Sequence, residues 1–445
     1  MPFPPAPEFP ATAGFRRQPA HRAGGGNVVP RGDSRRAIQP SAARLGALAA
    51  TLILGLPAAR GANPLEMPDT ADTFDFALGA QMLYDDNLFR LPASENPLPF
   101  AGKSRRSDLV YSTDVGIRID KPYAQQRFQL TATVTDNRYQ THDFLNHAAF
   151  DYRGAWLWHV TPRISGVVLA EQTQELNNFA DFRDFGQKSI QTNQVHVFSV
   201  DGDIGAGMHL LGGLLDVRSR NSQTFQAVGD YRQDGAELGI KYVSAAQNWI
   251  SLTRRETVGD YRGRVLDPLT QLDTGFSESA TEAALDWHAS VKSEIQAKLG
   301  YVDRRHDNFS RRDYSGALGR LLYRWEPTEK LRLDTSLSRN LFSFQENANS
   351  YYVADTLSMS PIWRYSPKTT LQLRYDYSNR DYRGAIVPVA EMRRDTVQSL
   401  LFTADWKATR KLTIVGTLRH IRRGSDLATY DYDSNSAGIS AQLLF

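Results

Sequence analysis

The chain has 445 residues, a net charge of +3 from 52 basic and 49 acidic side chains, and no cysteine. The near balance of charge argues against a dedicated nucleic-acid binder, which would carry a basic face or tail. The absence of cysteine excludes disulfides, zinc–thiolate sites and thiol nucleophiles. Aromatic residues make up 11% of the chain, which is more than a disordered chain usually carries.

The first predicted element is a secretory leader within residues 1–62. The stretch RLGALAATLILGLPAARGA follows two arginines, is apolar over about residues 45–58 and ends in small residues. This is the layout of a signal peptide, with cleavage after Ala59, Gly61 or Ala62. A transmembrane anchor is the alternative, but the stretch is short for one and contains Pro57. The residues ahead of it form an N-terminal extension, and residues 63–72 are expected to be a short periplasmic tail.

From residue 73 to the last residue, apolar and polar side chains alternate with the period of a β-strand. In "LVYSTDVGIRID", for example, Tyr111 and Val115 share one face, and Ser112 and Asp114 share the other. Helical spacing is nowhere sustained. The alternation predicts about 18 strands, with 16 as the lower bound, near residues 73–84, 107–120, 126–139, 148–160, 163–174, 190–201, 206–219, 231–244, 248–258, 276–289, 292–304, 313–325, 330–342, 351–365, 369–381, 394–406, 411–422 and 429–445.

A hairpin repeat is superimposed on this alternation. Five tryptophans each precede a short turn and a new strand: Trp158, Trp287, Trp325, Trp363 and Trp406. The connection at the other end of each hairpin is long and rich in Asn, Asp and Arg. A soluble propeller would need four short strands in each repeat. Two long strands in each repeat are typical of a membrane barrel instead.

We therefore predict an all-β fold for residues 73–445: a transmembrane, antiparallel, up-and-down β-barrel in the bacterial outer membrane. The tryptophans beside the short turns would form a periplasmic aromatic girdle at the edge of the lipid. The closing strand ends in "SAGISAQLLF", where Ile439, Leu443 and Phe445 share one face. That strand is expected to pair with the first strand and to face lipid. A terminal aromatic residue such as Phe445 resembles the signal read by the barrel-insertion machinery.

The other face of each strand would line a water-filled lumen. Parity places both signs of charge on that inner face, which suits a path for a hydrated polar solute. A simpler interpretation is that these charges only pair across strands. The predicted lumen residues are Arg118, Arg153, Lys241, Lys298, Arg320, Arg332, Arg374, Arg419, Asp114, Glu237, Glu282, Asp334, Asp376 and Asp405.

No catalytic constellation, cofactor site or metal site is predicted, and the chain is not expected to be an enzyme. His306 and His420, with nearby serines and aspartates, offer only a weak Ser–His hypothesis at the outer rim. An arginine cluster in the loop "RRHDNFSRRD" has two interpretations: contacts to lipopolysaccharide phosphates, or an ordinary solvated loop. Its members are Arg304, Arg305, Arg311 and Arg312.

At the end of the first strand stands "YDDNLFRLP", from Tyr84 to Pro92. This motif resembles the hallmark of the EpsL-type outer-membrane proteins of exopolysaccharide operons, which are associated with the exosortase system. The residues that carry the resemblance are Tyr84, Asp85, Asp86, Asn87, Leu88, Phe89 and Arg90. From the residues themselves, the two aspartates and the asparagine can cap the turn that leaves the strand. Calcium binding is the less favoured alternative, because no full ligand set is present.

The resemblance implies export of a polysaccharide across the outer membrane, with periplasmic export components as partners. The expected function is therefore a passive conduit for exopolysaccharide through a hydrated lumen. Outer-membrane lipid, lipopolysaccharide and the barrel-insertion machinery are the other expected partners. One alternative is a general or small-solute porin, and another is a closed structural or enzymatic barrel.

Overall fold

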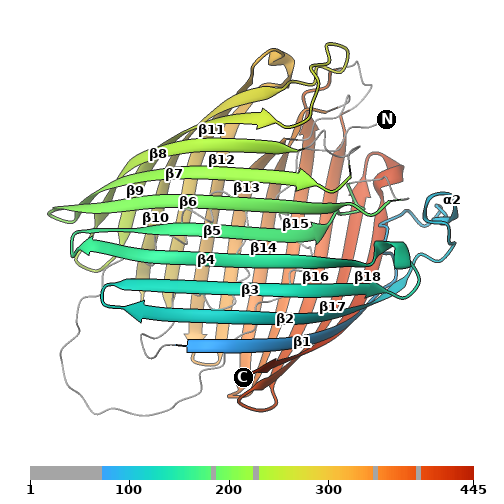
Figure 1. Ribbon diagram of the computed structural model, residues 1–445, viewed down its shortest axis with the longest axis horizontal. Helices are drawn as coiled ribbons and strands as arrows, with labels where there is room; N and C mark the ends of the chain where they lie inside the picture. Colours follow the sequence, from blue (N-terminus) through green and yellow to red (C-terminus); the bar gives the residue numbers. More distant parts are fainter. Residues whose placement is uncertain (1–72, 182–186, 224–229, 344–348, 387–391) are drawn as a thin grey trace.

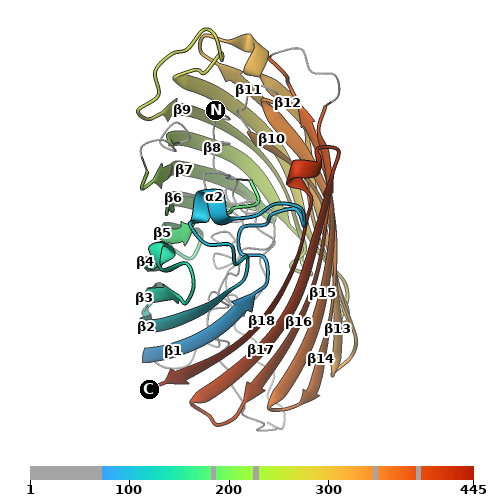
Figure 2. The same cartoon turned by 90° about the vertical axis from the view of Figure 1, so that its right-hand side faces the viewer.

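The first and last strands of the chain are hydrogen-bonded to each other, and this pairing closes the sheet into a barrel (Figures 1 and 2). The computed structural model describes residues 73–181, 187–223, 230–343, 349–386 and 392–445. The predicted leader and periplasmic tail therefore lie outside the described residues. Within those ranges, no helix is long and apolar enough to cross a membrane.

Every strand is antiparallel to its neighbours along the chain, so the barrel is an up-and-down meander. The strands are β1 (Thr73–Asp85), β2 (Asp108–Tyr123), β3 (Gln126–Tyr139), β4 (His147–Thr161), β5 (Ile164–Leu176), β6 (Ile190–Gly205), β7 (Met208–Asn221), β8 (Tyr231–Val243), β9 (Trp249–Tyr261), β10 (Gly275–Ser290), β11 (Ser293–His306), β12 (Tyr314–Thr328), β13 (Leu331–Ser343), β14 (Tyr351–Ser366), β15 (Thr369–Arg383), β16 (Arg394–Lys407), β17 (Leu412–Ser425) and β18 (Tyr432–Leu444). Short helical turns occur at α2 (Leu98–Ala101), Asp143–Leu145, Ser310–Arg312 and Ala428–Tyr430.

The predicted fold class and the count of 18 strands are confirmed, and the main differences lie at the strand ends. Strand β6 continues to Gly205 and β7 begins at Met208, so only two residues make the turn between them. Both turn residues, Ala206 and Gly207, have positive φ, which matches the tight primed turns that join antiparallel strands. Strand β18 begins at Tyr432 rather than at 429, because a helical turn at Ala428–Tyr430 precedes it.

The outer face of the barrel carries the exposed apolar side chains, as the alternation predicts. Along β1, for example, Phe74, Phe76 and Leu78 are each about half exposed. A soluble protein rarely exposes such large contiguous apolar surfaces, whereas a lipid-facing barrel needs them. The two rims differ as well: short turns join the strands at one end, and the long loops lie at the other (Figure 1).

Four of the five predicted girdle tryptophans are exposed at the short-turn rim, with relative exposures between 42% and 48%: Trp287, Trp325, Trp363 and Trp406. Trp158 also lies near this rim but is only 9% exposed. Its ring stacks on Phe198, with centroids 6.0 Å apart, and lies over Gly166 on β5. Trp158 therefore packs into the barrel wall and differs from the exposed members of the girdle.

The chain terminus is part of the closing seam. Pairing between β1 and β18 runs from Ala77 opposite Leu444 to Asp85 opposite Ser436. The Phe445 amide then donates to the Phe76 carbonyl at 2.9 Å. The predicted pairing of the first and last strands is thus confirmed. Because closure gives the edge groups of both strands partners, no strand edge is left along this seam.

The inner face is not uniformly polar. A buried apolar stripe crosses it from β4 to β10 and comprises Ala155, Leu157, Val167, Leu169, Val195, Val197, Val217, Tyr231, Tyr261 and Phe276. The stripe alternates with the exposed outer residues along the same strands, so the middle of β5, from Val167 to Ala170, is apolar on both faces. The expected mixed polar lining therefore holds only for part of the inner wall.

Packing of Trp158 over Gly166 yields a testable prediction. A Cβ atom added at Gly166 would lie 1.9 Å from the Ser199 carbonyl oxygen and 2.4 Å from the Trp158 ring. The Gly166→Ala variant is expected to lose about 1–3 kcal/mol of unfolding free energy, because overpacking forces these neighbours apart. Urea unfolding of the folded barrel in detergent, followed by tryptophan fluorescence, measures the loss.

Gly416, on the outer face of β17, is the matched control, since a Cβ atom there meets nothing within 4 Å. We expect Gly416→Ala to change the unfolding free energy by less than about 0.5 kcal/mol. Equal effects of the two substitutions would contradict the proposed packing.

Candidate functional site

The motif after β1 attaches the first long loop to the closing strand. The Asp85 carboxylate accepts two hydrogen bonds from the Arg90 guanidinium, at 2.8 and 2.7 Å, and one from the Ser434 hydroxyl at 3.0 Å. It also accepts the Asn87 amide at 2.9 Å. Asp86 accepts the backbone and side-chain amides of Asn435 at 2.7 and 2.8 Å. The expected capping bonds are therefore present, and the same residues bind the loop to β18.

The motif also directs apolar side chains into a small core at the long-loop rim, here called the mouth core. Its buried members are Phe89, Leu91, Ala101, Leu145 and Phe179. They come from three different loops, which lie between β1 and β2, β3 and β4, and β5 and β6. Viewed from the long-loop rim, the segment with α2 lies in front of the barrel opening (Figure 2). The mouth core therefore fixes three loops together over one side of the opening.

A second loop element reaches the far wall. Residues 177–181, which follow β5 and are here called the strap, place Phe179 in the mouth core. Ala180 packs on Ile421 and Tyr432, which belong to β17 and β18. Asp181 forms an ion pair with Arg423 on β17 at 2.7 Å. Several strands separate β5 from β17 in either direction around the barrel, so the strap crosses the opening.

The strap is held by a buried ionic cluster. Arg423 also pairs with Asp395, which in turn binds Arg393 at 2.8 Å. Arg380 on β15 lies 3.5 Å from Asp181. Burial alone would raise the pKa of the Asp181 carboxyl, but the guanidinium groups of Arg423 and Arg380 outweigh burial and hold that pKa well below its usual range. The strap carboxylate is therefore charged at neutral pH.

Charged side chains also gather at mid-height on the inner wall of β8–β12, in what we call the mid-lumen cluster. Arg255 pairs with Glu237 at 2.5 Å, and Lys298 lies 3.7 Å from Glu282. Arg320 stands directly opposite Lys298 in the sheet register. Three cations thus accompany two carboxylates. A small cationic excess inside a low-dielectric wall raises the local concentration of anions.

The structure places all fourteen predicted lumen residues on the inner face, as judged from register and from the exposure of alternate residues. Four of them meet in the mid-lumen cluster: Glu237, Glu282, Lys298 and Arg320. Six others pair with each other or with further inner residues: Arg332 with Asp334, Arg374 with Asp376, Arg153 with Glu171, and Lys241 with Asp201. Arg118, Asp114, Asp405 and Arg419 lie elsewhere on the wall, so the set is not one site.

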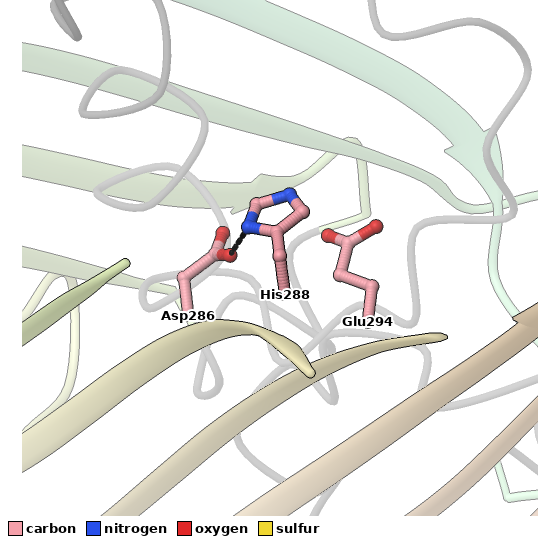
Figure 3. Close-up of side chains that lie close together, drawn as sticks. All are labelled: Asp286, His288 and Glu294. Atoms are coloured by element: carbon pink, nitrogen blue, oxygen red, sulfur yellow. Dashed lines mark ion pairs between the residues drawn. The ribbon is translucent and has the colours of Figure 1, made fainter. Parts of the chain in front are cut away.

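Near the short-turn rim, three side chains could supply one metal ligand each, which the sequence analysis did not anticipate (Figure 3). Ligand atoms of Asp286, His288 and Glu294 lie within 4.8 Å of one another. Arg324 already pairs with Glu294 at 2.5 Å, and Gln296 donates to the same carboxylate at 2.7 Å. Because these donors satisfy Glu294, the group is adequately explained as part of an ion-pair network.

The Ser–His hypothesis is not supported by the placement of the two histidines. His306 lies on the inner face, is buried, and stacks on the Tyr261 ring with centroids 6.3 Å apart. His420 lies on the outer face of β17, 2.9 Å from the Asn435 side chain. The two histidines therefore point to opposite sides of the wall.

The expected arginine cluster for lipopolysaccharide is also divided. Arg304 points inward and pairs with Glu278 at 2.7 Å. Arg312 is fully buried and donates to the Gln271 carbonyl at 2.8 Å, and burial lowers its pKa to about 10. Arg305 is exposed on the outer face. The four arginines therefore do not form one common cluster, because Arg304 points inward and Arg312 is buried.

Sequence reasoning missed the residues that hold the strap. Arg380 and Arg423 share the parity of the predicted Arg374 and Arg419, so the period-2 pattern could have placed them inside. Asp181 offered no such signal, because it lies in a loop, where no period applies.

The Asp85 bonds predict the stability of the seam. Asp85→Asn removes the charge that pairs with the nearly buried Arg90. Because an uncompensated buried cation is costly, the variant is expected to lose about 3–5 kcal/mol of unfolding free energy. Urea unfolding in detergent measures this loss. Asp433→Asn, an exposed carboxylate 3.9 Å from Arg422 on the neighbouring strand, is the control and should be nearly neutral. Equal losses would show that the seam does not depend on Asp85.

The strap predicts both a conductance change and a pH profile. Asp181→Asn breaks the ion pair with Arg423, so the strap should detach and single-channel conductance in a planar bilayer should rise or fluctuate.

The same carboxylate predicts a pH profile. Folding lowers the pKa of the Asp181 carboxyl, so its charge stabilises the docked strap at every pH above the ordinary carboxyl pKa, near 4. That stabilisation is lost only at lower pH, as the carboxylate becomes protonated. Conductance of the unmodified protein should therefore stay constant between about pH 8 and 5.

Asp143→Asn serves as the control for the strap, because Asp143 lies in the neighbouring loop, is exposed and pairs only loosely with Lys103 at 3.4 Å. Its conductance should match that of the unmodified protein. A strap variant with unchanged conductance would contradict the anchoring role of Asp181.

Comparisons with known proteins agree with this architecture. Residues 280–445 match the model of the family described as "Putative beta-barrel porin 2". This region contains most of β10 and the eight strands that follow. No curated protein matches the chain.

Three solved structures illustrate the likeness. The outer membrane protein OpdK of Pseudomonas aeruginosa shares 11% identity at a TM-score of 0.47, covering 84% of this chain and 99% of its own. A BenF-like porin of Pseudomonas fluorescens Pf-5 shares 11% at 0.46, with coverage of 84% and 99%. OpdQ of Pseudomonas aeruginosa shares 9% at 0.45, with coverage of 84% and 98%. At these values the likeness does not bear on which solute is carried.

The matched family description names porins and does not name the exopolysaccharide family. With its closed sheet, apolar outer face and aromatic rim, the protein is a bacterial outer-membrane β-barrel whose residues 280–445 resemble a β-barrel porin family.

Proposed function

We propose that the protein is a passive, porin-like channel for small hydrophilic solutes. The observation that carries the proposal is the combination of a charged mid-lumen cluster with a mouth narrowed by the strap. The charged wall offers a hydrated, polar solute replacement contacts for part of its water shell. A pathway of this kind needs no energy source and no partner protein.

The strap favours a small solute over a polymer. It crosses the opening and is held on the far wall by buried ion pairs with Arg423 and Arg380. Breaking one buried ion pair costs about 3–5 kcal/mol. A polysaccharide chain would have to displace this element to thread through the lumen, whereas a small solute can pass beside it.

The mid-lumen cluster favours small anions among these solutes. Arg255, Lys298 and Arg320 outnumber Glu237 and Glu282 at the same height. Because the surplus is one charge, selectivity should be weak and should fall as salt is added.

Polysaccharide export is the rival function, and it rests on the resemblance of the YDDNLFRLP motif. In this structure Asp85, Asn87 and Arg90 hold the first loop against β18. That structural role accounts for the motif without any polysaccharide, so the motif does not discriminate between the two functions.

Conductance of the purified protein in planar bilayers tests the proposal. We expect a steady conductance, and swelling of protein-containing liposomes in small sugars and amino acids that declines as the solute grows. Polysaccharide from the producing strain should leave the conductance unchanged. Block of the channel by that polymer would favour export, and no conductance at all would favour a closed barrel.

Charge selectivity tests the role of the mid-lumen cluster. Arg320→Gln should lower the anion-to-cation permeability ratio, measured as the reversal potential in a KCl gradient, by up to about fivefold, since a partly solvated charge contact is worth about 0.2–1 kcal/mol. Arg339→Gln, which removes an arginine from the outer face of β13, is the matched control and should leave the ratio unchanged. An unchanged ratio in Arg320→Gln would remove this cluster from the pathway.

A further inference from the structure

The outer face of the barrel carries charged side chains at an unexpected depth. We call them the outer charged patch, which comprises His196, Asp216, Arg218, Arg232, Asp234, Arg254 and Glu256. Strand parity places them on the same face as the exposed Leu214, Leu238 and Ile250. The patch spans β6–β9 and therefore occupies one side of the barrel wall.

The deepest charges lie in the middle of a strand. Arg254 is five residues from the start of β9 and seven from its end, and it stands opposite Leu238 of β8 in the sheet register. Leu238 is 73% exposed and belongs to the apolar belt. By contrast, the outward Arg339–Asp355 pair of β13 and β14 lies four residues from the long-loop end of each strand.

Lipid is a poor partner for this patch. Arginine or lysine on the lipid face of a barrel costs roughly 2–4 kcal/mol at the bilayer midplane. Pairing within the patch reduces this cost: Arg254 binds Glu256 at 2.7 Å, and Arg232 binds Asp216 and Asp234 at 2.9 Å each. The side chains of Arg254 and Glu256 nevertheless remain more than half exposed.

The charge balance indicates what covers the patch. Three arginines accompany three carboxylates, so the patch has no cationic surplus for the phosphates of lipopolysaccharide. In the sheet register Asp216 stands opposite Asp234 and Arg218 stands opposite Arg232, so an acidic pair lies beside a basic pair. A second copy turned by a twofold rotation can place its basic pair on this acidic pair and its acidic pair on this basic pair. Leu214, Leu238 and Val258 are exposed among the charges, which gives the face the mixed composition of a protein interface.

An apolar hollow adjoins the patch on the same outer face. It has a volume of about 380 Å³ and is lined by Phe128, Gly154, Trp156, Val168 and Ala170, among others. Ala170 of β5 stands opposite His196 of the patch. The hollow exists because Gly154 has no side chain where its neighbours carry rings. An apolar side chain of an adjacent molecule could pack into this hollow.

We propose that the outer face of β4–β9 is a subunit interface, at which a second copy of this chain covers the outer charged patch and fills the adjoining hollow. The inference is independent of the solute that the channel carries. It also gives the barrel two different outer faces, one for lipid and one for protein.

Cross-linking in native outer membranes tests the interface, and the cysteine-free chain permits single labels. Leu238→Cys places a thiol within the patch, and Leu418→Cys places one on the exposed outer face of β17. With a bismaleimide of moderate length, Leu238→Cys should give a covalent dimer and Leu418→Cys should not. Absence of a dimer at Leu238, or equal dimer at both positions, would overturn the proposal.

A second set of variants distinguishes an interface from a chance collision. In the Leu238→Cys protein, Arg254→Leu with Glu256→Leu should abolish most of the cross-linked dimer, while heat-modifiable migration on gels shows that the barrel is folded. Arg339→Leu with Asp355→Leu, on the other wall, should leave the dimer intact. Undiminished dimer in the Arg254/Glu256 variant would contradict the role of the patch. A monomer that retains bound lipopolysaccharide would show that lipid covers this face.

Discussion

The pairing of β1 with β18 is the constraint on which the rest of the structure depends. In hydrocarbon, a backbone amide or carbonyl without a partner costs several kcal/mol, so the sheet must close. Closure forces every strand to present one face to the outside and one to the lumen, and it fixes the register around the ring. The Asp85–Arg90–Ser434 bonds stand at the long-loop end of this seam, and the Phe445 amide stands at the other end. The mouth and the lumen are therefore both consequences of how the two ends of the chain meet.

Most of the fold could be predicted from the alternation of apolar and polar residues along the strands, because strand geometry fixes a period of two residues. It was enough to place Arg320 and Glu282 on the inner wall and to recognise the girdle at Trp287 and Trp406. The alternation was less informative for β5, where Val167, Val168 and Leu169 are consecutive and both faces are apolar. The alternation also could not predict packing detail. The exposed tryptophans and the buried Trp158 occupy the same position in their hairpins, and Trp158 differs in having a glycine, Gly166, beneath its ring.

The long loops could not be derived in this way. The strap joins Asp181 to Arg423, residues 242 apart in the chain, and nothing local in the sequence marks either as a partner. The same is true of the mouth core, whose Phe89, Leu145 and Phe179 come from three separate loops. Charge composition was informative about the lumen but misleading about the loop arginines, because burial of Arg312 depends on carbonyl groups of another loop. The loop contacts that narrow the mouth are therefore harder to predict from the sequence than the strands and the charges of the lumen.

The strap also has a consequence for the order in which the molecule is assembled. Its anchors, Asp395 and Arg423, lie on β16 and β17, close to the end of the chain, whereas the strap itself follows β5. The strap cannot dock before the last hairpins have joined the sheet. The same strands therefore complete the wall of the barrel and provide the strap with its anchors, so the mouth cannot be narrowed until the wall is nearly complete.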